Sequence, residues 1–135
     1  MNPDKSGKSP DQRGVLSNEE KAKISKEALK IHRECMPLFS LAKKLTEPDV
    51  QAIIIDSIGT INRKVLDIHE VRKTRQNGSG KKLEAESLVG ELRIKIEEFY
   101  KREMDEENRK VLQEILSYSE NILVSHIRQI KTKDL

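Results

Sequence analysis

The sequence predicts an all-α protein, specifically an antiparallel up-down four-helix bundle that follows a disordered N-terminal tail. Apolar residues recur at helical spacing along four separate segments, as they do on the buried face of an amphipathic helix. Aromatic residues make up only 3% of the chain, so Leu, Ile and Val must fill a narrow core. Charged residues reach 36%, which is typical of long helices with one buried stripe.

The first 15 residues are rich in Lys, Asp, Ser, Gly and Pro and nearly free of apolar groups. Such a segment buries too little surface to offset the entropy lost on ordering, so residues 1–15 are predicted to be a disordered basic tail. The whole chain of 135 residues has the length of one domain. We therefore expect a single helical-bundle domain over residues 16–133.

The first helix is predicted to begin at a capping box formed by Ser17 and Glu20. Pro37 lies inside its apolar stripe and lacks a backbone donor, which predicts a kink in a continuing helix. The stripe comprises Ile24, Ala28, Ile31, Cys35, Leu38, Ala42 and Leu45.

The second helix is predicted to begin with Thr46 as its N-cap and Pro48 in its first turn. Gly59, inside this helix, is expected to permit the close approach of a neighbouring helix. The run Asn77-Gly-Ser-Gly80 is predicted to end the helix and form a loop, natural or engineered. The apolar stripe comprises Val50, Ile54, Ile58, Ile61, Val65 and Ile68.

Two further stripes predict the third and fourth helices. We expect a turn near Met104 and Asp105, with Asp105 as the next N-cap; the alternative is one continuous helix over about residues 81–131. The third stripe comprises Ala85, Val89, Leu92, Ile96 and Phe99. The fourth comprises Leu112, Ile115, Ile122, Leu123, Ile127 and Ile130.

Residues that could support catalysis, a cofactor or a metal are few. The chain has three His and one Cys, Cys35, which lies on the first apolar stripe and is expected to be buried and inert. A Leu stands three residues before each His, so the Glu-x-x-His pattern of di-iron bundles does not occur. The sequence therefore predicts no enzyme activity, cofactor, metal site or small-molecule substrate.

The run HEVRKT, residues 69–74, resembles the H-box of sensor histidine kinases. In that family a His accepts a phosphoryl group, a following Glu assists, and the motif lies on a helix of a four-helix bundle. The resemblance implies that His69 is a candidate phosphoacceptor, with Glu70 as acid or base and Arg72 as the matching basic residue. Lys73 stands where the family has Thr, and no Pro follows Thr74.

Cations are predicted to gather at one end of the bundle, which we call the basic end. In an up-down-up-down bundle the starts of helices one and three lie beside the ends of helices two and four. Such an end is a candidate site for an anion or an acidic partner. The candidate residues are Arg72, Lys73, Arg75, Lys81, Lys82, Arg128 and Lys131.

The predicted function is that of a non-enzymatic interaction module or accessory subunit, which binds a protein partner or a second copy of itself. Apolar residues beyond the main stripes, namely Ile53, Ile55, Leu66, Leu88 and Leu116, indicate a face for oligomerisation. The alternatives are nucleic-acid association through the basic end and phosphotransfer through His69. The single Cys and the lack of a membrane-length apolar run predict a cytoplasmic protein in a reducing compartment, with no membrane partner.

Overall fold

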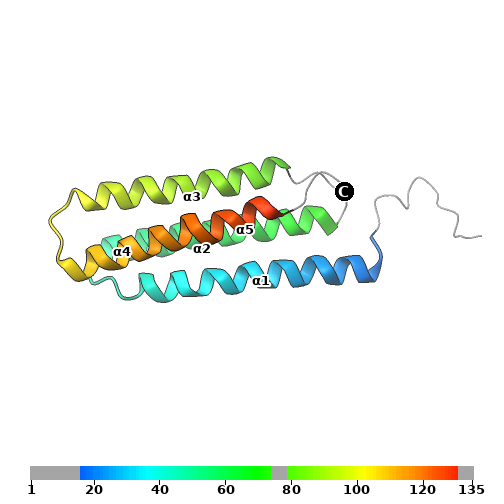
Figure 1. Cartoon of the computed structure of the whole chain (residues 1–135), viewed down its shortest axis with the longest axis horizontal. Coiled ribbons are helices and arrows are strands. Elements are labelled where there is room, and N and C mark those ends of the chain that lie inside the picture. The colour runs from blue at the N-terminus through cyan, green and yellow to red at the C-terminus, as the bar shows by residue number, and fades with distance from the viewer. Residues whose placement is uncertain (1–15, 74–78, 131–135) are drawn as a thin grey trace, which may run out of the picture.

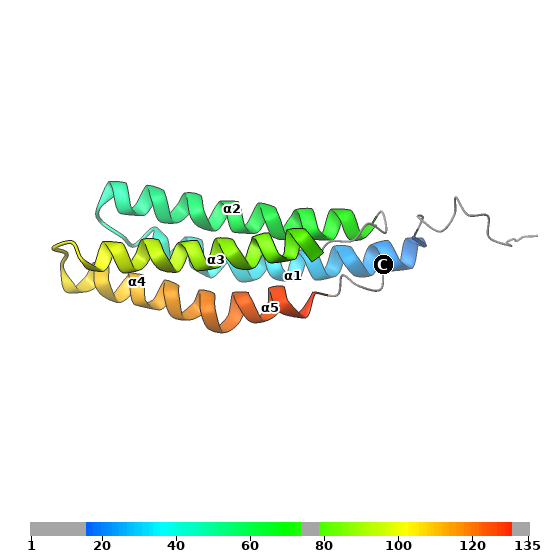
Figure 2. The same cartoon turned by 90° about the horizontal axis from the view of Figure 1, so that it is seen from above.

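The chain folds as a bundle of four antiparallel helical rods (Figures 1 and 2), as predicted. The computed structural model describes residues 16–73 and 79–130, so the predicted tail, residues 1–15, lies outside the described residues. The first three rods are single helices and the fourth is an α-helix with a π-helical segment, η2, inside it. The bounds are α1 Asn18–Ala42, α2 Pro48–Lys73, α3 Ser79–Tyr100, α4 Glu106–Tyr118, η2 Ser119–Leu123 and α5 Val124–Gln129.

Consecutive rods are neighbours, and the fourth rod closes the ring against α1. Their apolar stripes meet in one aliphatic core, in which nearly every predicted stripe residue is buried. Ala28 is half-buried and Ile122 is exposed. The contact between α1 and the fourth rod is made mainly through α4 and η2, whereas α5 packs on α3.

Helix α1 begins at the predicted capping box. The Ser17 Oγ accepts a hydrogen bond from the Glu20 backbone N–H (3.1 Å), and the Glu20 carboxylate accepts one from the Ser17 N–H (3.1 Å). The helix continues through Pro37 to Ala42 without a break. The side chain of Gln51 then caps its C-terminal end by donating to the carbonyl oxygens of Lys43 and Leu45, each at 3.0 Å.

Thr46 does not act as the predicted N-cap of α2, because it pairs across the bundle with Asn108 of α4. The Asn108 side chain accepts from the Thr46 N–H (3.0 Å) and donates to the Thr46 Oγ1 (2.8 Å). Helix α2 begins at Pro48, as expected for a proline in the first turn. The buried Asn108 thus ties the first connection to the start of α4.

The predicted turn between the third and fourth helices is present, and the single long helix is excluded. The Asp105 carboxylate accepts from the Asn108 N–H at 2.8 Å and forms the N-cap of α4. In the preceding turn, Arg102 forms ion pairs with Glu47 (3.4 Å) and Asp49 (2.9 Å). These pairs join the two connections at this end of the bundle.

The predicted glycine-rich loop is shorter than expected, because Ser79 and Gly80 lie in the first turn of α3. The first turn of any helix has N–H groups without partners in the helix, so its residues need not extend an existing run of hydrogen bonds. Helix α3 can therefore begin within the glycine-rich sequence 77–80. Asn77 and Gly78 lie outside the described residues.

The segment η2 corrects the prediction for Ile122. The buried positions here are Ile115, Ser119, Leu123 and Ile127, three successive steps of four residues. At 3.6 residues per turn each such step drifts by about 40° around an α-helix. The wider π turn takes up the drift and keeps all four on the core, while Ile122 turns outward with 37% of its surface exposed.

Gly59 leads to a stability prediction, because the expected close approach of a neighbour is absent. A Cβ added at Gly59 meets no other atom within 4 Å. Gly59→Ala should therefore raise the free energy of unfolding by up to about 1 kcal/mol through the higher helix propensity of Ala. Urea unfolding followed by circular dichroism checks this. Gly90→Ala, in the middle of α3 and equally unhindered, should act in the same direction; a loss of stability in both variants contradicts the reasoning.

Candidate functional site

The described cations assigned to the basic end lie at the end of α2, the start of α3 and the end of α5, and most of them are bound within the chain. Arg75 and Lys131 lie outside the described residues. Of the remaining five, Lys82 is bound to carbonyl groups and Arg72, Lys73 and Arg128 to acidic side chains. The cation count of this end therefore overstates its capacity for an external anion.

Lys82 has a structural partner that the sequence did not indicate. Its ammonium donates hydrogen bonds to the carbonyl oxygens of Arg128 (2.7 Å) and Ile130 (2.9 Å), at the C-terminal end of α5. These are carbonyl groups that a helix end leaves without intrahelical partners, and they carry the negative end of the helix dipole. Lys82 at the start of α3 therefore caps a different helix.

Of the other exposed cations of the basic end, Arg128 and Lys73 are paired and Lys81 is not. Arg128 Nε lies 2.9 Å from a Glu86 oxygen on α3, and Lys73 lies 3.7 Å from Glu70 one turn earlier on α2. Lys81 forms no hydrogen bond or ion pair with another described residue. The pKa of Glu84 is lowered chiefly by its hydrogen bond and ion pair with Lys64, and further by the charge of Lys81. Exposed pairs of this kind contribute about 0–1 kcal/mol each.

Beneath the basic end, His69 and Arg72 form a buried polar cluster with Glu27 of α1. His69 is 1% exposed and Arg72 is 6% exposed. The Arg72 Nη1 donates to the Glu27 carboxylate at 2.5 Å and lies 3.2 Å from the His69 Nδ1. Because a guanidinium only donates, the His69 Nδ1 must accept, so the proton of the neutral ring is on Nε2.

This environment keeps His69 neutral. Burial, followed by the positive charge of Arg72, lowers the pKa of His69 from 6.5 to about 4. The Nε2 is also buried and has no hydrogen-bond partner among the described residues. A phosphodonor needs an accessible ring nitrogen, and neither nitrogen of His69 is accessible here. The geometry therefore gives no support to phosphotransfer through His69, which stays a hypothesis.

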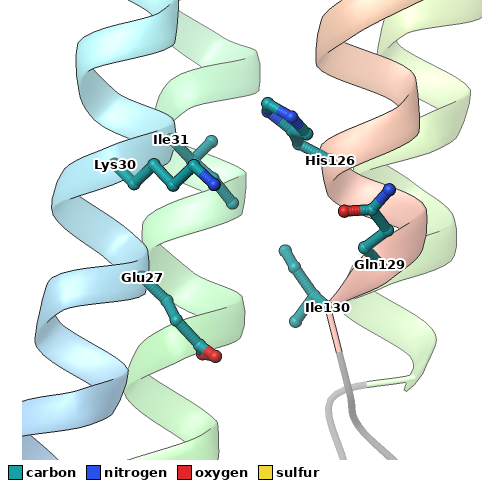
Figure 3. A pocket seen from close by; sticks show the side chains of 6 residues that line it. All are labelled: Glu27, Lys30, Ile31, His126, Gln129 and Ile130. Atoms are coloured by element: carbon teal, nitrogen blue, oxygen red, sulfur yellow. The ribbon is translucent and has the colours of Figure 1, made fainter.

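Beside this cluster, three hollows follow one another between α1 and the fourth rod; we call this furrow the α1–α5 seam. The first, about 260 Å³, has Arg72 and Glu27 in its wall. The second, about 160 Å³, is lined from both helices by Glu27, Lys30, Ile31, His126, Gln129 and Ile130 (Figure 3). The third, about 620 Å³, extends from Lys30 to Tyr118 of α4. Long polar side chains occupy positions where apolar packing would close the bundle.

The α1 side of the seam carries cations that are not paired with any residue the structure describes. Lys23, Lys26, Lys30 and Arg33, which we call the cation row, are exposed and line these hollows. No ion pair or side-chain hydrogen bond joins any of them to another described residue. Two acids of α1 contact residues of other helices instead: Glu27 contacts Arg72 and Glu34 contacts His126. The sequence shows the row at spacings of three, four and three, but not which acids are occupied.

The predicted oligomerisation face is only partly exposed. Ile55, Leu88 and Leu116 pack against the core, while Ile53 and Leu66 remain exposed on α2. Two apolar residues of α1 are also exposed, Leu29 at 47% and Met36 at 40%. Leu29 also lines the largest hollow of the seam, so apolar and basic side chains are interleaved there.

The described part of the chain offers neither an accessible thiol nor a cluster of metal-ligating side chains. The Cys35 thiol is fully buried, and its pKa is raised to about 11, chiefly by burial and further by Glu34. Across residues 16–73 and 79–130, no three His, Cys, Asp or Glu side chains are grouped closely enough to hold a metal ion. None of the described helices is both long enough and apolar enough to span a membrane.

The capping role of Lys82 can be separated from anion binding by comparing adjacent lysines. Lys82→Met should lower the free energy of unfolding by about 1 kcal/mol, because two carbonyl groups lose a charged donor. Lys81→Met is the matched control and should change stability by less than about 0.5 kcal/mol. Chemical denaturation measures both; equal effects of the two substitutions would contradict the capping role.

The buried His69 predicts a loss of stability in weak acid. Its pKa is near 4 in the folded state against 6.5 as the reference, so between these values the unfolded chain binds a proton that the folded chain refuses. Stability from this group is complete above pH 6.5 and falls as the pH drops to 4, by about 3 kcal/mol. Urea unfolding measured from pH 7.5 to 4 should show that the free energy of unfolding falls less steeply with decreasing pH in His69→Gln than in the wild-type chain. An imidazole titration by NMR with a midpoint near 6.5 would contradict this.

No protein-family model, curated protein or solved structure matches the chain. We therefore infer function from the side chains themselves. Three features bear on it: internally paired cations at the basic end, a buried neutral His69 and an open seam with an unpaired cation row on one side.

Proposed function

We propose that the chain is a non-enzymatic helical-bundle interaction module or accessory subunit that holds a partner protein at the α1–α5 seam. The observation that carries this proposal is the interleaving of exposed apolar and unpaired basic side chains beside open hollows. A bundle that needed only to be stable gains from closing such a furrow with apolar packing. The one buried cysteine fits a reducing compartment, and a cytoplasmic location is part of the proposal.

Nucleic-acid association through the basic end has less support. The cations assigned to it are largely bound to Glu27, Glu70, Glu86 and the end of α5. Aromatic residues that stack on single-stranded bases are scarce. Self-association is the second form of the proposal, favoured by Leu83 (67% exposed) and Ile94 (53% exposed) on α3.

A pair of leucine substitutions tests the seam. Leu29→Gln removes an exposed apolar contact from the seam, while Leu83→Gln removes one from α3, on a different face of the bundle. After nuclease treatment, the tagged wild-type chain isolated from its native cell should carry a protein partner of fixed stoichiometry by native mass spectrometry. Leu29→Gln should weaken this complex at least about fivefold, because truncating a central contact costs more than about 1 kcal/mol.

Leu83→Gln should leave the complex unchanged. Equal losses in both variants, or a complex that contains only further copies of this chain and is lost in Leu83→Gln, would reject the seam as the partner site. Both residues are exposed, so neither substitution removes a core contact, and circular dichroism verifies the helical content.

A further inference from the structure

The charges along the seam specify its partner more closely. We infer that the α1–α5 seam binds an acidic amphipathic helix of a partner protein, with carboxylates over the cation row and apolar side chains over Leu29. This inference rests on the proposed function and adds the chemistry and secondary structure of the partner.

The first argument is the geometry of the cation row. Spacings of three, four and three residues place Lys23, Lys26, Lys30 and Arg33 along one flank of α1. Over ten residues this flank extends about 15 Å. Carboxylates at positions i, i+3 or i+4, and i+7 of a second helix laid along α1 match that length and spacing.

The second argument is that no ion pair joins the row to an acid in the described part of the chain. On the facing rod, the stretch from Ser119 to Gln129 contains one acid, Glu120, which pairs with Arg93 of α3 at 3.7 Å. On α1 itself, Glu27 and Glu34 are turned to Arg72 and His126. An acidic partner would therefore gain ion pairs without displacing existing ones. A second copy of the chain, by contrast, would set one cation row against another.

The third argument distinguishes an acidic protein from nucleic acid. Phosphate backbones are bound by cations alone and gain nothing from apolar hollows. Here the hollows between the cations are lined by Leu29, Ile31 and Ile130, and by the ring of Tyr118. Apolar side chains spaced along a helix face, flanked by acids, fill such a furrow in the helix-in-groove mode of recognition.

Purified components test the inference. The probe is a labelled synthetic peptide helix with Glu residues along one flank and Leu along the adjacent one, measured by fluorescence anisotropy. A peptide with Lys in place of each Glu and a 20-base-pair DNA duplex are the comparison probes. The full chain should bind the acidic peptide most tightly, and raising the salt concentration should weaken that binding.

Charge reversal locates the binding. The combined variant Lys26→Glu, Lys30→Glu and Arg33→Glu should weaken binding of the acidic peptide at least about tenfold. The matched control, Lys44→Glu, Lys101→Glu and Lys110→Glu, makes the same change in net charge at exposed positions near the opposite end of the bundle and should alter binding less than about twofold. Equal losses in the two variants, or tighter binding of the duplex or the basic peptide, overturn the inference.

The inference and the proposed function fail in different ways. If the native complex is lost in Leu29→Gln yet survives the reversal of the cation row, the seam binds a protein but the partner is not acidic. If neither change affects the native complex, the proposed function fails as well.

Discussion

Burial of one aliphatic stripe per helix is the interaction on which the rest of this structure depends. Each fully buried Leu or Ile contributes roughly 1.5–3 kcal/mol, several times the contribution of an exposed ion pair. The stripes therefore fix the rotation of every helix about its axis. This rotation determines which residues the charged side chains on the flanks contact. Core packing sets the positions of the helices, and these positions bring Lys82 to the end of α5 and Lys64 to within 2.7 Å of Glu84.

The fold could be read from the sequence because its signals are local. Helical periodicity, the capping box at Ser17 and the N-cap at Asp105 each depend on residues within a few positions of one another. The errors arose where a residue contacts a distant segment. Thr46 was assigned to its own helix but pairs with Asn108, 62 positions away. The sequence does not indicate the π segment because Ser119 is polar, although its buried position completes the four-residue steps.

The candidate site was less predictable for the same reason. The sequence shows where the cations are, but an unpaired cation differs from a paired one only through its neighbours on other helices. The sequence predicts Arg72 to be one of the cations of the basic end, but it is buried against Glu27. Lys30 and Arg33, which are not among the predicted site residues, line the seam. The sequence around His69 resembles a phosphoacceptor motif, yet the packing of α1 on α2 buries the His69 side chain. Charge composition thus shows where the cations lie along the chain, but not which of them are paired with residues of another helix.

The π segment also constrains how this chain can change in length. Its wide turn holds one residue more than an α-helix would use, so the stretches before and after it follow separate helical registers. Deleting a single residue between Ser119 and Leu123 would restore a uniform α-helix in which Ile115 and Ile127 stand eleven residues apart, within about 20° of the same face at 100° per residue. Leu123 and Ile127 would therefore stay on the core. A one-residue deletion elsewhere in this rod, where no wide turn absorbs it, would rotate the residues beyond it by about 100°.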